Sequence, residues 1–296
     1  MRVGAIFSQA DSGTDPAAIR RWAVTAEEAG FEHILAYDHI LGATDERLAD
    51  GNFAPFPGPP YTNENTFHEI LVLYGHLAAI TQSIQFVTSV LVLPQRTTAV
   101  AAKQLATLDL LSGGRVRVAV GTGWNWADYQ GLGVDFGQRT AILEEQMDVM
   151  RLLWSQPVVD FAGRFHQLDG VGINPLPSRP LPLLMGSRGS EPVLRRVVRK
   201  ADGWMPLLAP GLDPVDVSSA TRRLREICEE EGRDPDTLPI HGRVYLGDGW
   251  QAGVEQAVEL GYHDPSLGAG RGQFATNAEG LDAIVAAKTR VDAIVG

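Results

Sequence analysis

Four short groups of polar and glycine residues carry the side chains that could do chemistry, and each follows an apolar run. They are Asp38-His39, Thr88-Ser89, Gly121-Thr122-Gly123-Trp124-Asn125 and Gly186-Ser187-Arg188-Gly189. The preceding runs are rich in β-branched residues, as between Val116 and Val120, and this pattern is typical of strands. If these strands are parallel, their carboxyl ends lie on one face, and the four groups would line a single pocket.

His39 is the candidate for proton transfer. Imidazole titrates near neutral pH, so a histidine at a strand end could donate a proton to a reacting group or accept one from it. Asp38 is its neighbour, and adjacent residues of a regular strand face opposite sides, so only one of the two would point into the pocket. The alternative is that His39 is a satisfied polar residue beneath the loop that follows (42–63).

The glycine-rich groups predict contacts with a ligand. Backbone without side chains at Gly121 and Gly123 would let a large flat molecule approach, with Trp124 beside it. The alternative is a sharp turn next to core tryptophans. The group Gly186–Gly189 precedes a helix, where free N–H groups, a hydroxyl and a guanidinium together suit a phosphate. An ordinary strand–helix turn is the alternative there.

The elements that position these groups alternate strictly between strand and helix. Strands are expected at 2–7, 33–39, 84–93, 116–120, 183–185, 203–208, 240–246 and 261–267, with helices at 16–30, 67–80, 98–111, 139–154, 191–201, 213–232, 252–260 and 278–294. Eight such units predict an α/β fold, a (β/α)8 TIM barrel with insertions after strands 2 and 4 and before strand 5. If the weak last strand is absent, an open doubly wound sheet is the alternative. The insertion before strand 5 contains one extended piece, 158–168.

Composition limits the class of protein. A length of 296 residues suits one domain spanning 1–296, and 36 acidic against 25 basic residues give a net charge of -11, which would repel nucleic acid and anionic membranes. The one cysteine, Cys228, excludes an internal disulfide framework. With no signal peptide and no apolar run long enough to span a membrane, we expect a cytoplasmic protein.

Several familiar motifs are absent. Position 126 is Trp where a dinucleotide fingerprint starting at Gly121 needs glycine, and position 72 is Val where a zinc motif starting at His68 needs a second histidine. No G-x-S-x-G or P-loop pattern occurs. The sequence therefore gives little support to metal chemistry or serine hydrolysis, and no metal site is expected.

Over residues 2–290 the chain resembles the luciferase-like monooxygenase superfamily, the flavin- and deazaflavin-dependent (β/α)8 oxidoreductases. The resemblance rests on A-Y-D-H (36–39), V-L-P-Q-R-T (92–97), K-Q-L-A-T-L-D-L-L-S-G-G-R (103–115), G-T-G-W (121–124), F-x-G-x-F (161–165), P-L-L-M-G-S (182–187) and A-D-G-W (201–204). The match is looser at 262–273, which would form part of the substrate wall.

The resemblance implies a reduced flavin or coenzyme F420 across the barrel mouth. His39 and Asp38 would be catalytic, meeting the ring or the substrate. The implied cofactor-binding residues are Thr88 and Ser89 along the ring, where members often have a bulge or non-prolyl cis bond, Thr122, Gly123 and Trp124 beside it, and Gly186, Ser187 and Arg188 at the phosphate.

The Asp-His pair and the A-D-G-W region are more similar to the F420-dependent branch than to the FMN branch. The resemblance therefore implies an F420-dependent oxidoreductase that transfers a hydride to or from a small organic substrate. The anionic tail of F420 would favour bases near the mouth, for which Arg96, Lys103, Arg164 and Arg188 are candidates.

The resemblance leaves two alternatives for the activity. One is an FMN-dependent two-component monooxygenase supplied by a separate flavin reductase, and the other is a catalytically silent barrel that binds a flavin-like ligand. We also expect a homodimer.

Overall fold

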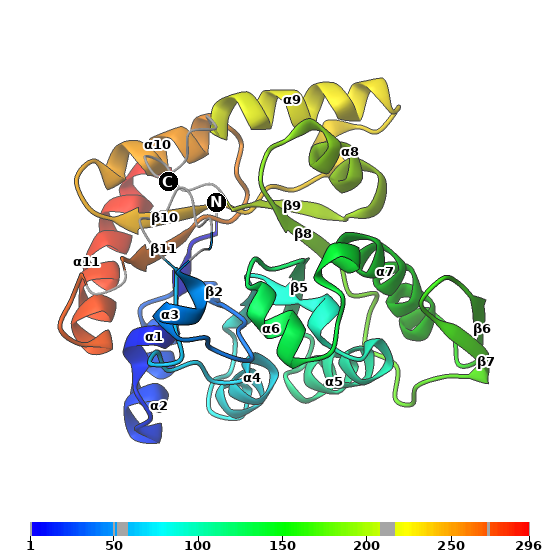
Figure 1. Ribbon diagram of the computed structural model, residues 1–296. Coiled ribbons are helices and arrows are strands. Elements are labelled where there is room, and N and C mark those ends of the chain that lie inside the picture. Colours follow the sequence, from blue (N-terminus) through cyan, green and yellow to red (C-terminus); the bar gives the residue numbers. More distant parts are fainter. Residues whose placement is uncertain (1, 50, 52–58, 208–216, 271–272, 296) are drawn as a thin grey trace.

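Eight parallel strands curl into a barrel surrounded by helices in the computed structural model, which describes residues 2–49, 51, 59–207, 217–270 and 273–295 (Figure 1). The strand order is β10-β11-β1-β2-β3-β5-β8-β9, and β4 also pairs with β5. The strands are β1 (Gly4–Ile6), β2 (His33–Ala36), β3 (Gln85–Thr88), β4 (Leu91–Val92), β5 (Val116–Gly121), β8 (Leu183–Ser187), β9 (Gly203–Pro206), β10 (Arg243–Leu246) and β11 (Ser266–Ala269).

The two outer strands of this order meet just before β10. Trp204 of β9 bridges Ile240 in parallel, and the Trp204 N–H donates to the Pro239 carbonyl over 2.9 Å. The His241 N–H returns a 2.9 Å bond to the Trp204 carbonyl. The predicted barrel is confirmed, with its insertions after strands 2 and 4 and before strand 5.

The helices lie where the apolar periodicity predicts them, with short extra helices in the loops. They are α1 (Gln9–Ser12), α2 (Pro16–Glu28), α3 (Asp45–Leu48), α4 (Ile70–Ala78), α5 (Thr98–Leu111), α6 (Trp126–Gly131), α7 (Arg139–Ser155), α8 (Glu191–Lys200), α9 (Val217–Glu230), α10 (Trp250–Glu259) and α11 (Asn277–Val295), with 3-10 turns at Leu93–Gln95, Phe136–Gln138 and Pro235–Thr237. At α2 the Asp15 carboxylate accepts from the N–H groups of Ala17 and Ala18, as an N-cap should. The expected helix start at Asp213-Pro214 and the expected strand end at residue 208 lie outside the described residues.

The strand expected at 84–93 is in fact two. Its continuity is broken after β3 by a cis peptide bond between Ser89 and Val90, and β4 then pairs with the upper part of β5. At the break the Thr88 hydroxyl donates to the Ala119 carbonyl over 2.7 Å and accepts from the Ala119 N–H over 2.9 Å. This side chain therefore replaces backbone pairing between β3 and β5.

The excursion before strand 5 is a hairpin, where the sequence indicated one extended piece. β6 (Val159–Ala162) and β7 (Gln167–Val171) pair antiparallel and project from the side of the barrel (Figure 1). The Glu145 carboxylate of α7 holds the tip of this hairpin by accepting from the N–H groups of Arg164, Phe165 and His166. The last strand also differs, because β11 begins at Ser266 and runs past the expected 267.

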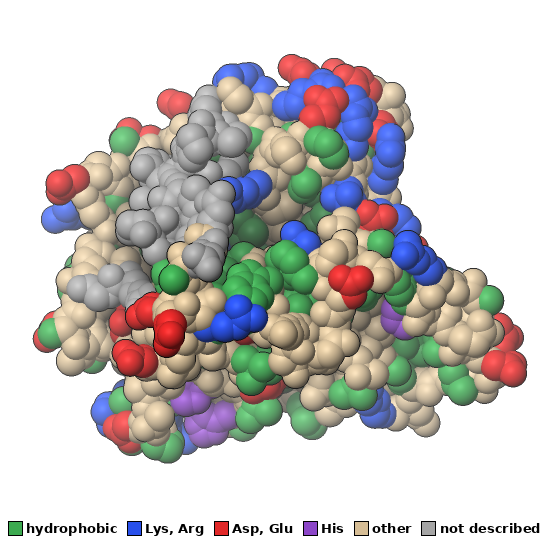
Figure 2. Space-filling view, viewed as in Figure 1, with side chains coloured by type: hydrophobic (Ala, Val, Ile, Leu, Met, Phe, Trp, Pro, Cys, Tyr) green, Lys and Arg blue, Asp and Glu red, His purple; other side chains and the backbone are tan. Residues whose placement is uncertain are grey.

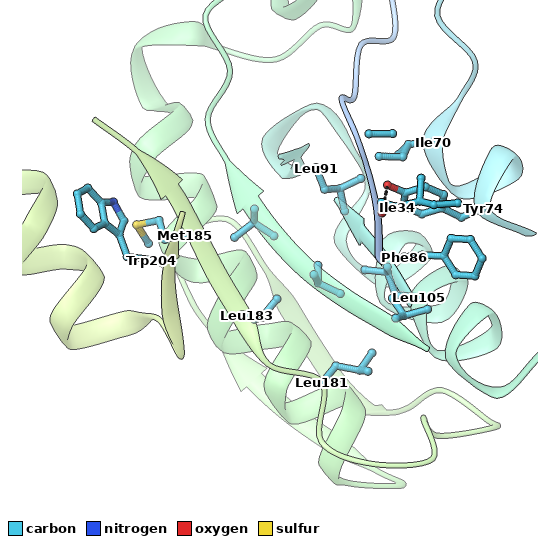
Figure 3. Close-up of a cluster of buried hydrophobic side chains, with 14 of the residues drawn as sticks. Ile34, Ile70, Tyr74, Phe86, Leu91, Leu105, Leu181, Leu183, Met185 and Trp204 are labelled. Atoms are coloured by element: carbon cyan, nitrogen blue, oxygen red, sulfur yellow. Dashed lines mark hydrogen bonds between the residues drawn. The ribbon is translucent and has the colours of Figure 1, made fainter. Parts of the chain in front are cut away.

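Two apolar clusters form the core. The larger one packs the outer faces of the strands against the helices, and Figure 3 shows Ile34, Phe86 and Leu183 in it. The Tyr74 hydroxyl in this cluster donates to the Val87 carbonyl over 2.6 Å. The smaller cluster fills the barrel interior, and its buried members are Ile6, Leu35, Val87, Val90, Ala119, Leu184 and Met205. Alternation between the two clusters, as at 34 and 35, is the two-residue period of a strand covered on both faces.

The amino-terminal end of the barrel is closed by a buried charged cluster. The carboxylate of Asp264 is fully buried. Its oxygens lie 2.5 Å from a guanidinium nitrogen of Arg117, 2.8 Å from one of Arg2 and 3.3 Å from the His241 ring. The two guanidinium groups and the histidine ring compensate for the loss of hydration of the buried carboxylate. This end is the stability face of such barrels, so the site must be sought at the opposite end. Within the described residues, no helix is long and apolar enough to cross a membrane.

Candidate active site

The four groups predicted from the sequence meet at the carboxyl ends of neighbouring strands, which we call the mouth. The strands β2, β3, β5 and β8 are consecutive in the sheet, and Asp38-His39, Ser89, Thr122–Asn125 and Ser187 lie at their ends. The short helices α3 and α6 lie on the same side (Figure 1). Figure 2 views this side and shows hydrophobic side chains gathered near its centre, with Lys and Arg side chains around them.

Asp38 is committed to structural partners. Its buried carboxylate accepts from the Val92 N–H over 2.9 Å and from the Arg96 guanidinium over 2.6 Å. Burial raises the pKa of Asp38, an effect that Arg96 and the Val92 N–H oppose. Arg96 also pairs with Glu69 over 2.6 Å, so it is neutralised within the chain. Asp38 therefore anchors β4 and Arg96 beside the mouth.

His39 faces a different environment, made of aromatic rings. Its centroid lies 3.7 Å from that of Tyr61, 4.6 Å from that of Phe67 and 6.5 Å from that of Trp124. Desolvation lowers the pKa of His39 to about 3, so the imidazole is neutral at physiological pH. Among the described residues neither ring nitrogen has a hydrogen-bond partner, which leaves one acceptor and one donor for a ligand.

Tyr61 and Asp128, which the sequence did not single out, form a buried polar network with Asn125, which it did. The Tyr61 hydroxyl donates to the Asp128 carboxylate over 2.6 Å and accepts from the Asn125 amide over 2.9 Å. Asn125 also donates to Asp128 over 2.7 Å and caps α6. Desolvation raises the pKa of Asp128 to about 6. An aromatic residue closing the proline-rich insertion was the available signal, but its partners are more than 60 positions away.

The glycines at the mouth make room for two valines of the chain itself. A Cβ at Gly121 or at Gly186 would overlap the Val90 side chain, and one at Gly123 would lie 2.8 Å from Val92 Cγ1. Gly123 also has a φ of 62°, which favours glycine. The sequence indicated that these glycines admit a ligand. Their Cβ positions are instead occupied by the segment after the cis bond, so Val90 is the group that faces the interior there.

The loop before α8 holds the predicted phosphate residues in a defined frame. The Ser187 hydroxyl accepts from the Trp204 indole N–H over 3.0 Å, so the A-D-G-W segment is joined to the glycine-serine pair. Ser190 precedes α8 without a side-chain capping bond. Glu191, in the first turn, is paired with Arg195 over 2.7 Å and Arg223 over 2.8 Å, so its charge is neutralised.

The other predicted residues differ in whether their polar groups already have partners within the chain. Ser89 has a buried hydroxyl with no partner among the described residues, whereas the Thr88 hydroxyl is used between strands. The Thr122 carbonyl accepts from the Tyr129 hydroxyl. Of the predicted bases for an anionic tail, Lys103 donates to the Asn174 carbonyl and Arg164 to the Gln138 amide oxygen over 2.7 Å, away from the mouth.

A family model described as luciferase-like monooxygenase matches residues 2–290. The chain belongs to this family. An uncharacterized protein of Mycobacterium tuberculosis is 32% identical over 268 residues, which cover 88% of each chain. Pyrimidine monooxygenase RutA of Escherichia coli is 31% identical over 174 residues, covering 56% of this chain and 47% of RutA.

Solved structures show the same fold within this family. An F420-dependent secondary alcohol dehydrogenase superposes with a TM-score of 0.65 at 21% identity, covering 86% of this chain and 73% of that one. Monooxygenase RslO1 from Streptomyces bottropensis gives the same TM-score and identity, covering 99% of this chain and 82% of that one. The chain is therefore a member of an oxidoreductase family, and its structural neighbours include F420-dependent and flavin-dependent enzymes.

Proposed function

We propose that this luciferase-like protein binds coenzyme F420 at the barrel mouth and transfers a hydride to or from a small organic hydroxyl or carbonyl compound. The observation that carries the proposal is His39, a neutral imidazole at the end of β2 that lies among aromatic rings and has no hydrogen-bond partner in the part of the chain that the structure describes. The Asp-His pair and the A-D-G-W region favour F420 over FMN. The F420-dependent alcohol dehydrogenase of the same fold supports this choice.

The residues at the mouth fit a tricyclic ring with a phosphorylated chain. The buried Ser89 hydroxyl has no partner among the described residues and is available to a polar ring edge. Val90, which lies against Gly121 at the end of β5, and Trp124, which follows that strand, would offer apolar surface to the ring. Gly186, Ser187 and Arg188 would hold the phosphate at the start of α8, where backbone N–H groups and the helix dipole favour an anion.

The roles of the chain's own residues follow from their contacts. F420, when bound, supplies the carbon that gives or accepts the hydride. His39, neutral in the free protein, binds the substrate oxygen through its unprotonated ring nitrogen and accepts the hydroxyl proton when the substrate is oxidised. In the reverse direction the imidazole must first take a proton from solvent, and the imidazolium then donates it to the substrate oxygen. Tyr61 keeps the imidazole plane in place by stacking at 3.7 Å and is itself fixed by Asp128 and Asn125. Asp38 acts as a positioning residue through Arg96 and Val92.

An FMN-dependent monooxygenase is the second candidate, favoured by the similarity to pyrimidine monooxygenase RutA. That activity would need a flavin reductase as partner. Titrating the protein with F420 and with FMN, followed by fluorescence, separates the two proposals. Tight binding of F420 and weak binding of FMN is the result we expect. The reverse order would overturn the F420 proposal, and binding of neither would leave the catalytically silent barrel.

A further inference from the structure

Arg243 reaches across the barrel interior to the mouth. It is the first residue of β10, yet its guanidinium donates to the Pro206 carbonyl over 3.4 Å and lies 5.8 Å from the centroid of the Tyr37 ring. Pro206 ends β9, and Tyr37 follows β2, which is separated from β10 by β11 and β1. A side chain that contacts both must project through the interior, and both contacts lie at carboxyl ends of strands.

The charge of Arg243 is not neutralised within the described part of the chain. Two other arginines are paired with carboxylates. Arg117 pairs with Asp264 over 2.5 Å, and Arg96 pairs with Asp38 and Glu69. Arg243 has no carboxylate within ion-pair distance among the residues the structure describes. Arg243 is partly buried, and a partly buried guanidinium without a counter-charge is unfavourable for a folded protein, so a bound anion would stabilise it.

Two tyrosine hydroxyls complete the group. The hydroxyls of Tyr37 and Tyr245 bond to each other, and the Arg243 guanidinium lies beside the Tyr37 ring. Desolvation raises the pKa of Tyr37, so this phenol stays protonated and does not neutralise the arginine. In the hydrogen bond between Tyr37 and Tyr245 only one of the two hydroxyls donates. The other hydroxyl still has a hydrogen that it can donate to a ligand.

We propose that Arg243, with Tyr37 and Tyr245, is an anion-recognition subsite on the floor of the mouth that takes an anionic oxygen of the molecule bound there. Arginine suits a planar pair of oxygens such as a carboxylate. This chemistry has two sources, a substrate that carries a carboxylate or the oxygen-bearing edge of the cofactor ring in its reduced, electron-rich form. The second source rests on the proposed function, whereas the first does not.

The test compares the wild type with Arg243→Met and Arg243→Lys, and uses Arg290→Met, an exposed change on α11, as the matched control. In one arm, formate, acetate and benzoate are titrated by calorimetry into the protein without and with oxidised cofactor. In the other arm, the Kd of F420 or FMN is measured for the oxidised and the chemically reduced forms. Circular dichroism verifies that each variant is folded.

Arg243→Met should lower the affinity for the anion by about tenfold or more, the loss expected when a charge-assisted hydrogen bond is removed. Weaker carboxylate binding with unchanged cofactor binding would assign the subsite to the substrate. Weaker binding of the reduced form alone would assign it to the cofactor ring. Arg243→Lys keeps the charge but not the planar fork and should lose less in the same arm.

Equal behaviour of Arg243→Met and Arg290→Met in both arms would overturn the proposal. If the wild type binds neither F420 nor FMN, the proposed function fails, but the carboxylate arm still decides the role of Arg243. If Arg243→Met does not fold, Arg243→Lys carries the decision, and unchanged affinities in that variant overturn the subsite.

Discussion

The imidazole of His39 lies against the phenol ring of Tyr61, with centroids 3.7 Å apart and planes inclined by 30°. These residues come from β2's end and from the end of the proline-rich insertion, 22 positions later. The stack brings an imidazole ring from the barrel and a phenol ring from a loop into one site. The loop is therefore part of the site and not only a cover for it.

Replacement of His39 by Asn should lower turnover by about 100-fold or more, the usual contribution of a positioned acid or base. Cofactor affinity should stay within about threefold, because the ring contacts the aromatic cluster and not the loop before α8. Steady-state rates and a fluorescence titration measure the two effects. His76→Asn, an exposed change on α4, is the control, and a variant at position 39 with full turnover would contradict the assignment.

Tyr61→Phe should preserve the stack on His39 but leave the buried Asp128 without its hydroxyl partner. Such orphaned groups cost about 1–3 kcal/mol, and the free energy of unfolding should fall by that amount in urea titrations. Tyr61→Ala should lose the stack as well and lower turnover further. If both variants had the same rate, the stack would have no part in positioning His39.

Gly186→Ala should destabilise the protein, because the added Cβ would overlap Val90. Overpacking of this kind costs about 1–3 kcal/mol. The double variant Gly186→Ala with Val90→Ala should lose less stability than the sum of the two single changes, since each makes room for the other. Strict additivity in a double-mutant cycle would show that the two positions are not in contact.

Arg188→Ala should weaken binding of a phosphorylated cofactor more than binding of a phosphate-free analogue. For FMN against riboflavin the difference should be about tenfold, as for one charge-assisted bond. Equal losses for the two ligands would show that Arg188 does not hold the phosphate.

Acidification should destabilise the fold through the buried His241. Burial, together with Arg117, lowers its pKa to about 3 against an ordinary value of 6.5. Below pH 6.5 the His241 ring is protonated in the unfolded chain but stays neutral in the folded protein. The free energy of unfolding therefore falls as the pH decreases from 6.5 towards 3. Between pH 7 and pH 5 this histidine should contribute about 2 kcal/mol to the loss.

The measurement for this effect is urea unfolding at pH 7 and pH 5. His241→Gln removes the titrating ring, so its stability should depend less on pH than that of the wild type by that amount. The same pH dependence in both proteins would mean that His241 is protonated in the folded state.

The alternation of strand and helix, the barrel and the family were all predictable from the sequence, and the catalytic role of His39 stays a prediction. Local patterns suffice for these, because a strand buried on both faces reads as a continuous apolar run and a helix start is marked by its own cap, as at Asp15. Because β2, β3, β5 and β8 are parallel neighbours in the sheet, the polar residues that follow them lie on the same side of the barrel.

Only the tertiary structure decided which of these residues are committed to the fold and which are available to a ligand. Asp38 and Thr88 were predicted as site residues, but their side-chain oxygens have partners within the chain. Asp38 accepts from Arg96 and Val92, and Thr88 donates to Ala119. The roles of Tyr61, Asp128 and Arg243 could not be read from the local sequence, because a hydrogen bond or an unpaired charge depends on partners that lie far away in the sequence. The reason is physical: residue type determines what a side chain can donate or accept, but packing determines whether a partner within the chain has already taken it.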